Sequence, residues 1–243
     1  MSRIWNSIKI TPVNPSVVFS LKNKSFLTRK LAGLAVNYII KNTYSKLTVN
    51  PRYHENAFVL NSLHSLIPQG SKVLDIGSAE SDFPLYLQAS GFEVTPFDQR
   101  EYPLLPSIRG DAMKLDHYFQ PSSFDAITVI STIEHIGIGA YGDARNSVTY
   151  LSLIDLWKAI LKPSGFMLIT LPVTSGETRR EPGQWVANLF SFRKSLTESH
   201  AIAVKEKLVV ENDALACRWE EVAVNTGVDF NTGVYMCAVR FNI

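Results

Sequence analysis

The amino-acid sequence predicts an α/β domain built on a doubly wound, mostly parallel sheet with helices on both faces. From about residue 52 onward, short apolar runs alternate with helical patterns, as strands joined by crossover helices do. Several runs end at turns that contain Gly or Pro. One run, FDAITVI at residues 124–130, is apolar on both faces, which is typical of a central parallel strand.

The expected elements follow in regular order along the chain. Helical patterns cover residues 53–67, 83–90, 150–161 and 189–198, and the third of these is expected to end at the tract KPSG, residues 162–165. Strand patterns cover residues 71–76, 92–97, a short unit at 108–112, and then 124–130, 166–171, 205–210 and 234–241.

Size, charge and cysteine content narrow the class of protein. A chain of 243 residues suits one sizeable domain, and a net charge of +2 does not suggest a nucleic-acid partner. Cys217 and Cys237 fit a reducing compartment. The longest early apolar run, residues 31–40, is too short to span a membrane, and no signal-peptide pattern opens the chain. We therefore expect a cytoplasmic protein.

Residues 1–50 differ in character from residues 51–243. They are rich in Lys and Arg, and no acidic residue precedes Glu55. Leu27, Leu31, Leu34 and Tyr38 follow a helical spacing. This pattern fits a basic amphipathic helix packed on the main domain. It also fits a lid over a site, or a surface that touches an anionic membrane or an acidic substrate.

A tight turn between the first strand and the next helix is the candidate ligand site. The segment VLDIGSAES, residues 73–81, places Asp75 at the end of the strand and Gly77 two residues later, followed by the small Ser78 and Ala79. A glycine lets the backbone approach a ligand, and ligands of doubly wound sheets lie beyond the carboxyl ends of the strands. The nicotinamide fingerprint G-x-G-x-x-G is absent, because Ala79 and Asp82 replace its later glycines.

Two further acids follow the next two strand patterns. Asp98 closes the second strand, where a carboxylate can accept hydrogen bonds from ribose hydroxyls. Asp111 ends the third unit, where it can accept from an adenine amino group. Asp125 opens the fourth strand and is expected to cap or orient backbone. Acids after three consecutive strands indicate a binding edge better than any one of them alone.

The chain resembles the class I S-adenosylmethionine-dependent methyltransferases over roughly residues 52–175. The resemblance rests on VLDIGSAES, VTPFDQR, IRGDA, FDAITVISTIEHIG and LKPSGFMLITLPV. It implies a Rossmann-like sheet with an antiparallel last strand, and S-adenosylmethionine as cofactor. The residues that it assigns to cofactor binding are Asp75, Gly77, Ser78 and Ala79 near the methionine, Asp98 at the ribose, Asp111 and Ala112 at the adenine, and Ile130 and Ser131 closing the pocket. The chain departs from the family at positions 79 and 81, where Ala and Ser replace glycine.

The segment STIEHIGIGAYGD, residues 131–143, holds the candidate catalytic residues. It is similar to a subgroup of these methyltransferases that includes uncharacterised members and others found with glycan-modifying genes. His135 is the candidate general base, with Glu134 beside it, and Tyr141 and Asp143 are expected near the acceptor. The alternative is that Glu134 caps a helix and that His135 is solvated or satisfied in the core.

The function expected from these residues is methyl transfer to a small-molecule or glycan-linked acceptor. A non-catalytic binding or scaffold protein with the same fold is the main alternative, and a nicotinamide-dependent oxidoreductase is a weaker one. The five histidines lack metal-ligand spacing, and no G-x-S-x-G hydrolase elbow occurs. Trp185 and Phe190 are expected in the core, with a substrate pocket as the other reading.

Overall fold

The computed structural model describes residues 51–79, 81–102, 104–139, 149–212, 218–225, 227 and 229–241. Its helices are α3 (Arg52–Leu66), α4 (Phe83–Ala89), η2 (Ala112–His117), η3 (Ile133–His135), α5 (Tyr150–Lys158) and α6 (Leu189–Glu198). Its strands are β1 (Lys72–Ile76), β2 (Glu93–Asp98), β3 (Ile108–Arg109), β4 (Phe124–Ile130), β5 (Leu161–Thr174), β6 (Arg179–Glu181), β7 (Gln184–Asn188), β8 (Ala201–Asn212), β9 (Arg218–Val222) and β10 (Gly233–Phe241).

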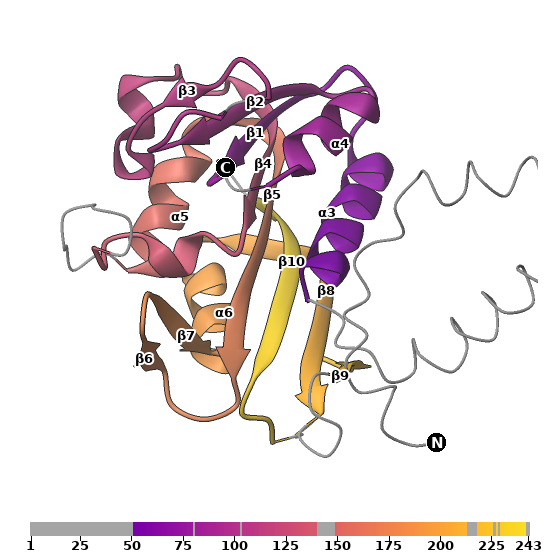
Figure 1. Ribbon diagram of the computed structural model, residues 1–243, viewed down its shortest axis with the longest axis vertical. Helices are drawn as coiled ribbons and strands as arrows, with labels where there is room; N and C mark the ends of the chain where they lie inside the picture. The colour runs from indigo at the N-terminus through magenta and orange to yellow at the C-terminus, as the bar shows by residue number, and fades with distance from the viewer. Residues whose placement is uncertain are drawn as a thin grey trace, which may run out of the picture. The chain divides into compact units, whose positions relative to one another are not determined.

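The main sheet has the strand order β3-β2-β1-β4-β5-β10-β8-β9 (Figure 1). The first five strands in this order, from β3 to β5, are parallel to one another. The last strand of the chain, β10, lies antiparallel between β5 and β8, and β9 pairs antiparallel with β8. The predicted fold class is therefore confirmed, including the antiparallel last strand.

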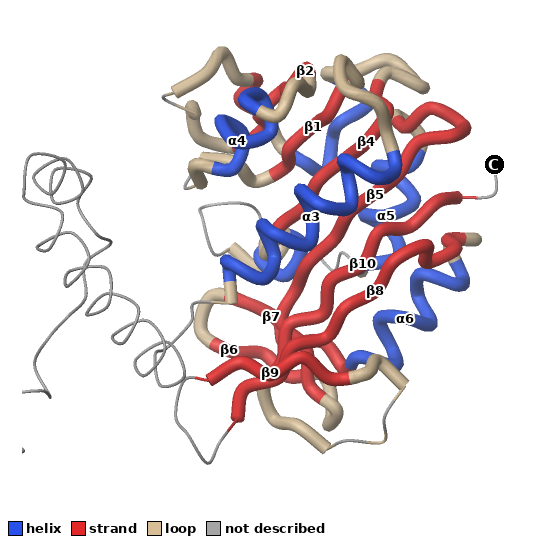
Figure 2. The backbone as a smooth tube through the Cα atoms, turned by 90° about the vertical axis from the view of Figure 1, so that its right-hand side faces the viewer, coloured by secondary structure: helices blue, strands red, loops and turns tan. Residues whose placement is uncertain are grey.

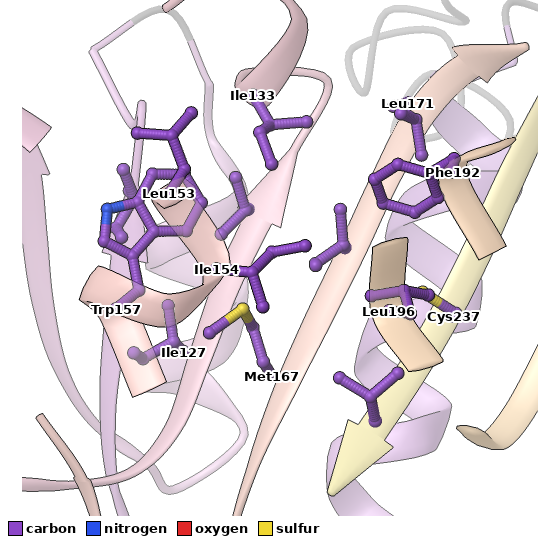
Figure 3. Close-up of a cluster of buried hydrophobic side chains, with 14 of the residues drawn as sticks. Ile127, Ile133, Leu153, Ile154, Trp157, Met167, Leu171, Phe192, Leu196 and Cys237 are labelled. Carbon is purple, nitrogen blue, oxygen red and sulfur yellow. The ribbon is translucent and has the colours of Figure 1, made fainter. Parts of the chain in front are cut away.

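Helices cover both faces of this sheet, with α3 on one face and α5 and α6 on the other (Figure 2). Successive side chains of a strand point to opposite faces. Ile127 of β4 accordingly packs with Trp157 of α5, as Figure 3 shows. Its neighbour Ala126 packs in a second cluster that contains Val59 of α3 and Leu87 of α4. This alternation also places Asp75, Thr128 and Thr170 on the α3 side.

The main difference from the sequence prediction concerns the link between α5 and β5. The helix ends at Lys158 and not at residue 161, and the strand begins at Leu161. Leu161 pairs with Phe124 and is 2 % exposed, so burial beside β4 draws it into the sheet. The KPSG tract lies within this strand, at a shift in register.

Other differences are extensions and additions to the sheet. The strand β8 runs from Ala201 to Asn212 because β10 and β9 pair with it along this length. The β6–β7 hairpin and β9 were not predicted. The sequence does contain a signal for the hairpin, because Pro182-Gly183 between β6 and β7 is an ordinary turn dipeptide.

Some expectations fall on residues that the structure does not describe. The basic segment at residues 1–50, the loop residues Tyr141 and Asp143, and Cys217 all lie outside the described ranges. Within those ranges, no helix is long and apolar enough to cross a membrane.

Candidate functional site

The turn after β1 brings the backbone close to the end of β4. Gly77 has φ +85°, and its N–H donates to the carbonyl of Phe97 at 2.8 Å. A Cβ atom at this position would lie 2.2 Å from Oγ1 of Thr132, a distance that no side chain tolerates. Gly77 is thus required both by its left-handed conformation and by the close approach of Thr132.

The same turn is joined to the end of β2 through Asp98. The N–H of Ala79 donates to Oδ2 of Asp98 at 3.1 Å, and the N–H of Arg100 donates to Oδ1 at 2.9 Å. An ionised carboxylate offers about four acceptor positions, so Asp98 keeps acceptor capacity for further donors. The structure therefore brings Asp98 together with Gly77 and Ala79, as the sequence predicts.

At position 81, where the resembling family has glycine, the serine side chain serves the helix. The hydroxyl of Ser81 accepts a hydrogen bond from the N–H of Phe83, the first residue of α4, at 3.1 Å. A side-chain acceptor at this place satisfies one of the helix's free N–H groups. Ser81 therefore supports the helix that follows the turn.

Asp111 and Ala112 follow β3, next to the end of β2. Gly110 donates its N–H to the backbone carbonyl of Asp98 at 2.8 Å, so these two chain segments adjoin. Oδ1 of Asp111 caps η2 by accepting from the N–H of Met113 at 2.9 Å. The carbonyl of Ala112 accepts from the indole N–H of Trp157 at 2.8 Å. Both residues therefore have structural partners at this edge of the sheet.

Asp75 is buried on the α3 side of the sheet. It is 3 % exposed, and Oδ1 accepts from the hydroxyl of Thr128 at 2.5 Å. Burial raises the pKa of this carboxyl to about 7, and the Thr128 hydrogen bond opposes the shift. Ser78 is fully buried, and its hydroxyl has no hydrogen-bond partner within the described part of the chain.

A buried network that the sequence did not predict holds the end of β4. Glu55 of α3 is 2 % exposed, and its Oε1 accepts from the hydroxyls of Ser131 and Thr170, the latter at 2.5 Å. Oε2 lies 3.5 Å from Nε of Arg52, and Nη1 of Arg52 donates to the carbonyl of Ile130 at 3.1 Å. The pair Arg52-x-x-Glu55 at the start of a helix was the available signal, but nothing in the sequence names its distant partners.

Glu134 and His135 lie in η3, directly after this network. Glu134 is 1 % exposed, and burial raises the pKa of its carboxyl to about 8. Nδ1 of His135 lies 2.6 Å from the carbonyl of Gly183 in the β6–β7 hairpin, and because a carbonyl only accepts, Nδ1 carries the proton. Nε2 lies 3.9 Å from Oε1 of Glu134. The Gly183 carbonyl, and not Glu134, therefore orients the imidazole.

Tyr150, at the start of α5, is a further polar group in this region. Its hydroxyl is buried and, like Oε2 of Glu134, has no hydrogen-bond partner among the residues described. Burial raises the pKa of Tyr150 above its ordinary value, and the charge of Glu134 adds to the shift. Tyr150 was not among the site residues predicted from the sequence.

Two aromatic residues near the hairpin differ in position. Trp185 of β7 is half-buried, with the guanidinium of Arg180 5.8 Å from the centroid of its ring. Phe190 is 55 % exposed, so its expected place in the core is wrong. In the first turn of α6, Phe190 points to solvent, whereas Leu189 and Phe192 are buried in the core. No group of three or more His, Cys, Asp or Glu side chains within the described ranges is placed to hold a metal ion.

Comparison with protein families gives a match over part of the chain, and comparison with curated proteins gives none. Residues 102–178, less than half of the chain, match a family described as Caenorhabditis protein of unknown function, DUF268. No curated protein matches by sequence.

Solved structures are similar over most of the chain. A 1,6-didemethyltoxoflavin-N1-methyltransferase of Burkholderia thailandensis, bound to 1,6-didemethyltoxoflavin and S-adenosylhomocysteine, aligns with TM-score 0.56 and 15 % identity over 96 % of this chain and 93 % of that one. The (4+2)-cyclase SpnF aligns with TM-score 0.57 and 13 % identity over 77 % and 81 %. A putative sarcosine dimethylglycine methyltransferase of Galdieria sulphuraria aligns with TM-score 0.55 and 12 % identity over 78 % and 86 %.

These similarities extend over most of the chain, with TM-scores of 0.55 to 0.57. At such low identity they establish the architecture and not the reaction. The chain has the fold of the class I S-adenosylmethionine-dependent methyltransferases.

Proposed function

We propose that the protein binds S-adenosylmethionine and transfers its methyl group to a small-molecule or glycan-linked acceptor. The observation that carries the proposal is the hydrogen bond from Ala79 to Asp98 beside the Gly77 turn. It joins the two chain segments that would hold the methionine and the ribose. Two of the similar structures are named methyltransferases, and one of them holds S-adenosylhomocysteine.

The residues at this edge suit the chemistry of that cofactor. Asp75 is a buried carboxyl with one hydroxyl partner, so it can receive the ammonium of the methionine. Asp98 keeps acceptor capacity for the ribose hydroxyls, and the hydroxyl of Ser78 has no hydrogen-bond partner among the residues that the structure describes. Asp111, Ala112, Ile130 and Ser131 complete the proposed set. The bound cofactor would supply a methyl group already activated by the sulfonium, so the protein mainly has to align the acceptor.

His135 would assist by taking a proton from a hydroxyl or ammonium acceptor. Its protonated Nδ1 is held by Gly183, which leaves Nε2 as the basic nitrogen of the neutral ring. The acceptor would approach this nitrogen from beyond the end of β4. Glu134 would contribute a second polar group on the same side, since its Oε2 has no partner among the described residues.

SpnF supports a second candidate function. It shares the fold, yet it is named as a cyclase. The fold therefore also suits a protein that binds the cofactor without transferring its methyl group, either as a scaffold or for other chemistry.

Two experiments separate these proposals. Calorimetric titration with S-adenosylmethionine, S-adenosylhomocysteine and NADH tests the cofactor, and we expect heat only from the first two. Absence of binding at millimolar ligand would refute the cofactor assignment. Incubation with methyl-labelled S-adenosylmethionine and a panel of small hydroxyl, amine and glycoside acceptors then tests transfer. Cofactor binding without label transfer to any acceptor class would favour the second function.

A further inference from the structure

The end of β4 turns through an unfavourable backbone conformation. Ser131 has φ +41°, in the left-handed region that non-glycine residues rarely occupy. Its N–H donates to both the carbonyl and the hydroxyl oxygen of Thr170, each at 3.0 Å. Strain of this kind persists only where the surroundings hold it in place. Neighbouring groups must therefore hold Ser131 in this conformation.

Besides Thr170, Glu55 of α3 holds Ser131 in place. One oxygen of its buried carboxylate accepts from the hydroxyl of Ser131, directly after β4, and from the Thr170 hydroxyl on β5. Its other oxygen faces Arg52, which donates in turn to the carbonyl of Ile130. A buried carboxylate with charge-assisted hydrogen bonds is rigidly placed, because any departure leaves a charge unsatisfied.

Two parts of the candidate site follow Ser131 directly in the chain, namely Thr132 beside the Gly77 turn and the η3 segment with His135. The next residue, Thr132, packs against Gly77 so closely that no Cβ would fit there. The residues after it, Ile133 to His135, form η3 and carry the candidate base. A shift at Ser131 would therefore move the wall of the cofactor turn and His135 together.

From these contacts we infer that Glu55 is a positioning residue, which acts through Ser131 to place Thr132 against the Gly77 turn and His135 against Gly183. The contacts of Glu55 are to the side chains of Ser131, Thr170 and Arg52. The inference rests on the proposed function for its ligand, S-adenosylmethionine, but not for its geometry. It assigns a role in the site to α3, a helix that otherwise only covers the sheet.

Asp125, at the opposite end of β4, provides a control. Asp125 also bridges neighbouring strands, since it accepts from the N–H of Lys72 on β1 at 2.9 Å and from Nζ of Lys162 on β5 at 2.7 Å. It lies at the start of β4, and Glu55 acts at its end. Asp125 is more exposed than Glu55, at 25 % against 2 %, so its loss should cost less stability, and only the loss of Glu55 should affect the site.

The experiment compares Glu55→Ala, Glu55→Gln and Asp125→Ala in the full-length protein by three measurements. These are the melting temperature, the affinity for S-adenosylhomocysteine by calorimetry, and the ring-nitrogen NMR signals of His135, which report its tautomer. We expect Glu55→Ala to weaken S-adenosylhomocysteine binding about tenfold, because Thr132 would no longer be held against the Gly77 turn, and to shift or broaden the His135 signals. Glu55→Gln keeps an oxygen for the two hydroxyls and should restore most of both. Asp125→Ala should lower only the melting temperature.

The outcomes separate the inference from the proposed function. If the wild type does not bind S-adenosylhomocysteine, the proposed function fails, and the His135 signals still decide the role of Glu55. If Glu55→Ala lowers the melting temperature but leaves binding and the His135 signals as in the wild type, Glu55 is only structural and the inference is wrong. Should Glu55→Ala not fold, Ser131→Ala removes the same hydrogen bond from the other side. Unchanged His135 signals in folded Ser131→Ala would equally overturn the inference.

Discussion

The carboxylate of Asp98 accepts a hydrogen bond from the backbone N–H of Ala79 at 3.1 Å. This contact joins the turn after β1 to the end of β2. It fixes the loop that carries Gly77, Ser78 and Ala79 relative to the acid that would hold the ribose. The contact also makes Asp98 the residue whose replacement tests the cofactor site most directly.

Asp98→Ala should weaken binding of S-adenosylmethionine by about 10- to 100-fold, because it removes charge-assisted hydrogen bonds to the ligand and frees the loop N–H. Isothermal titration calorimetry measures this. Asp116→Ala, which removes an exposed acid on η2, serves as the control and should bind as the wild type does. Equal affinities for all three proteins would remove Asp98 from the site.

Gly77→Ala should be among the most damaging single substitutions in the domain. A left-handed conformation costs a non-glycine residue about 1–3 kcal/mol, and the new methyl group would also overlap the side chain of Thr132. We expect a clear loss of unfolding free energy in urea, together with loss of cofactor binding. Gly183→Ala provides the comparison, because Gly183 also has positive φ but open space around it. If both variants were equally stable, the close approach of Thr132 would be unimportant.

Asp125→Ala should lower the free energy of unfolding by roughly 1–3 kcal/mol, the range for hydrogen bonds to charged groups. Burial works in the opposite direction, but the hydrogen bonds from Lys162 and from the Lys72 N–H lower the pKa of Asp125 below the ordinary value of 3.8. A lowered pKa stabilises the fold above that value, and the stabilisation is lost as the pH falls through the folded-state pKa. The difference between wild type and variant in urea unfolding should therefore shrink below about pH 4, whereas a constant difference would contradict the assignment.

Glu134→Gln should stabilise the protein, increasingly so as the pH rises. The unfolded chain releases this proton near the ordinary pKa of 4.5, whereas burial holds it in the folded protein to about pH 8. Wild-type stability is therefore lost over this interval, and the glutamine variant escapes that loss. Urea unfolding from pH 4.5 to 8.5 measures the difference in unfolding free energy between variant and wild type. Asp75 also has a raised pKa, but it is present in both proteins, so its contribution cancels in this difference. Glu198→Gln, at a half-exposed acid on α6, should show no such trend. Parallel stability curves for Glu134→Gln and wild type would show that Glu134 ionises normally.

His135→Ala should lower turnover by about 10²–10⁴-fold, the usual contribution of a general base. Its affinity for the cofactor should stay nearly unchanged, since the imidazole is expected to face the acceptor. Steady-state rates with an acceptor from the panel, combined with calorimetry, make the test. If turnover persists while the melting temperature falls, the hydrogen bond to Gly183 is structural and the reaction proceeds by alignment alone.

Local patterns in the sequence were enough for the helices, the parallel strands and the glycine turn. Asp125 was expected to orient backbone, and its hydrogen bond from the N–H of Lys72 confirms this. The roles of Arg52, Glu55 and Thr170 were out of reach, because their partners lie 78, 76 and 115 residues apart in the chain. Such contacts depend on which strand faces are covered by α3, and periodicity does not encode this. The end of α5 was misplaced for a similar reason, since pairing with β4 outweighed the turn signal at residues 162–165.

The backbone carbonyl of Gly183, in the β6–β7 hairpin, accepts a hydrogen bond from Nδ1 of His135. This carbonyl belongs to the backbone, so hairpin residues other than Gly183, whose φ of +86° favours glycine, can vary without removing the hydrogen bond. The residues proposed for the cofactor lie at the ends of β1, β2, β3 and β4, whereas the hairpin lies beyond the end of β4, where β7 pairs with the last residues of β5. On the proposed function, changes in this surface hairpin would therefore alter the acceptor side without altering the strands that bind the cofactor.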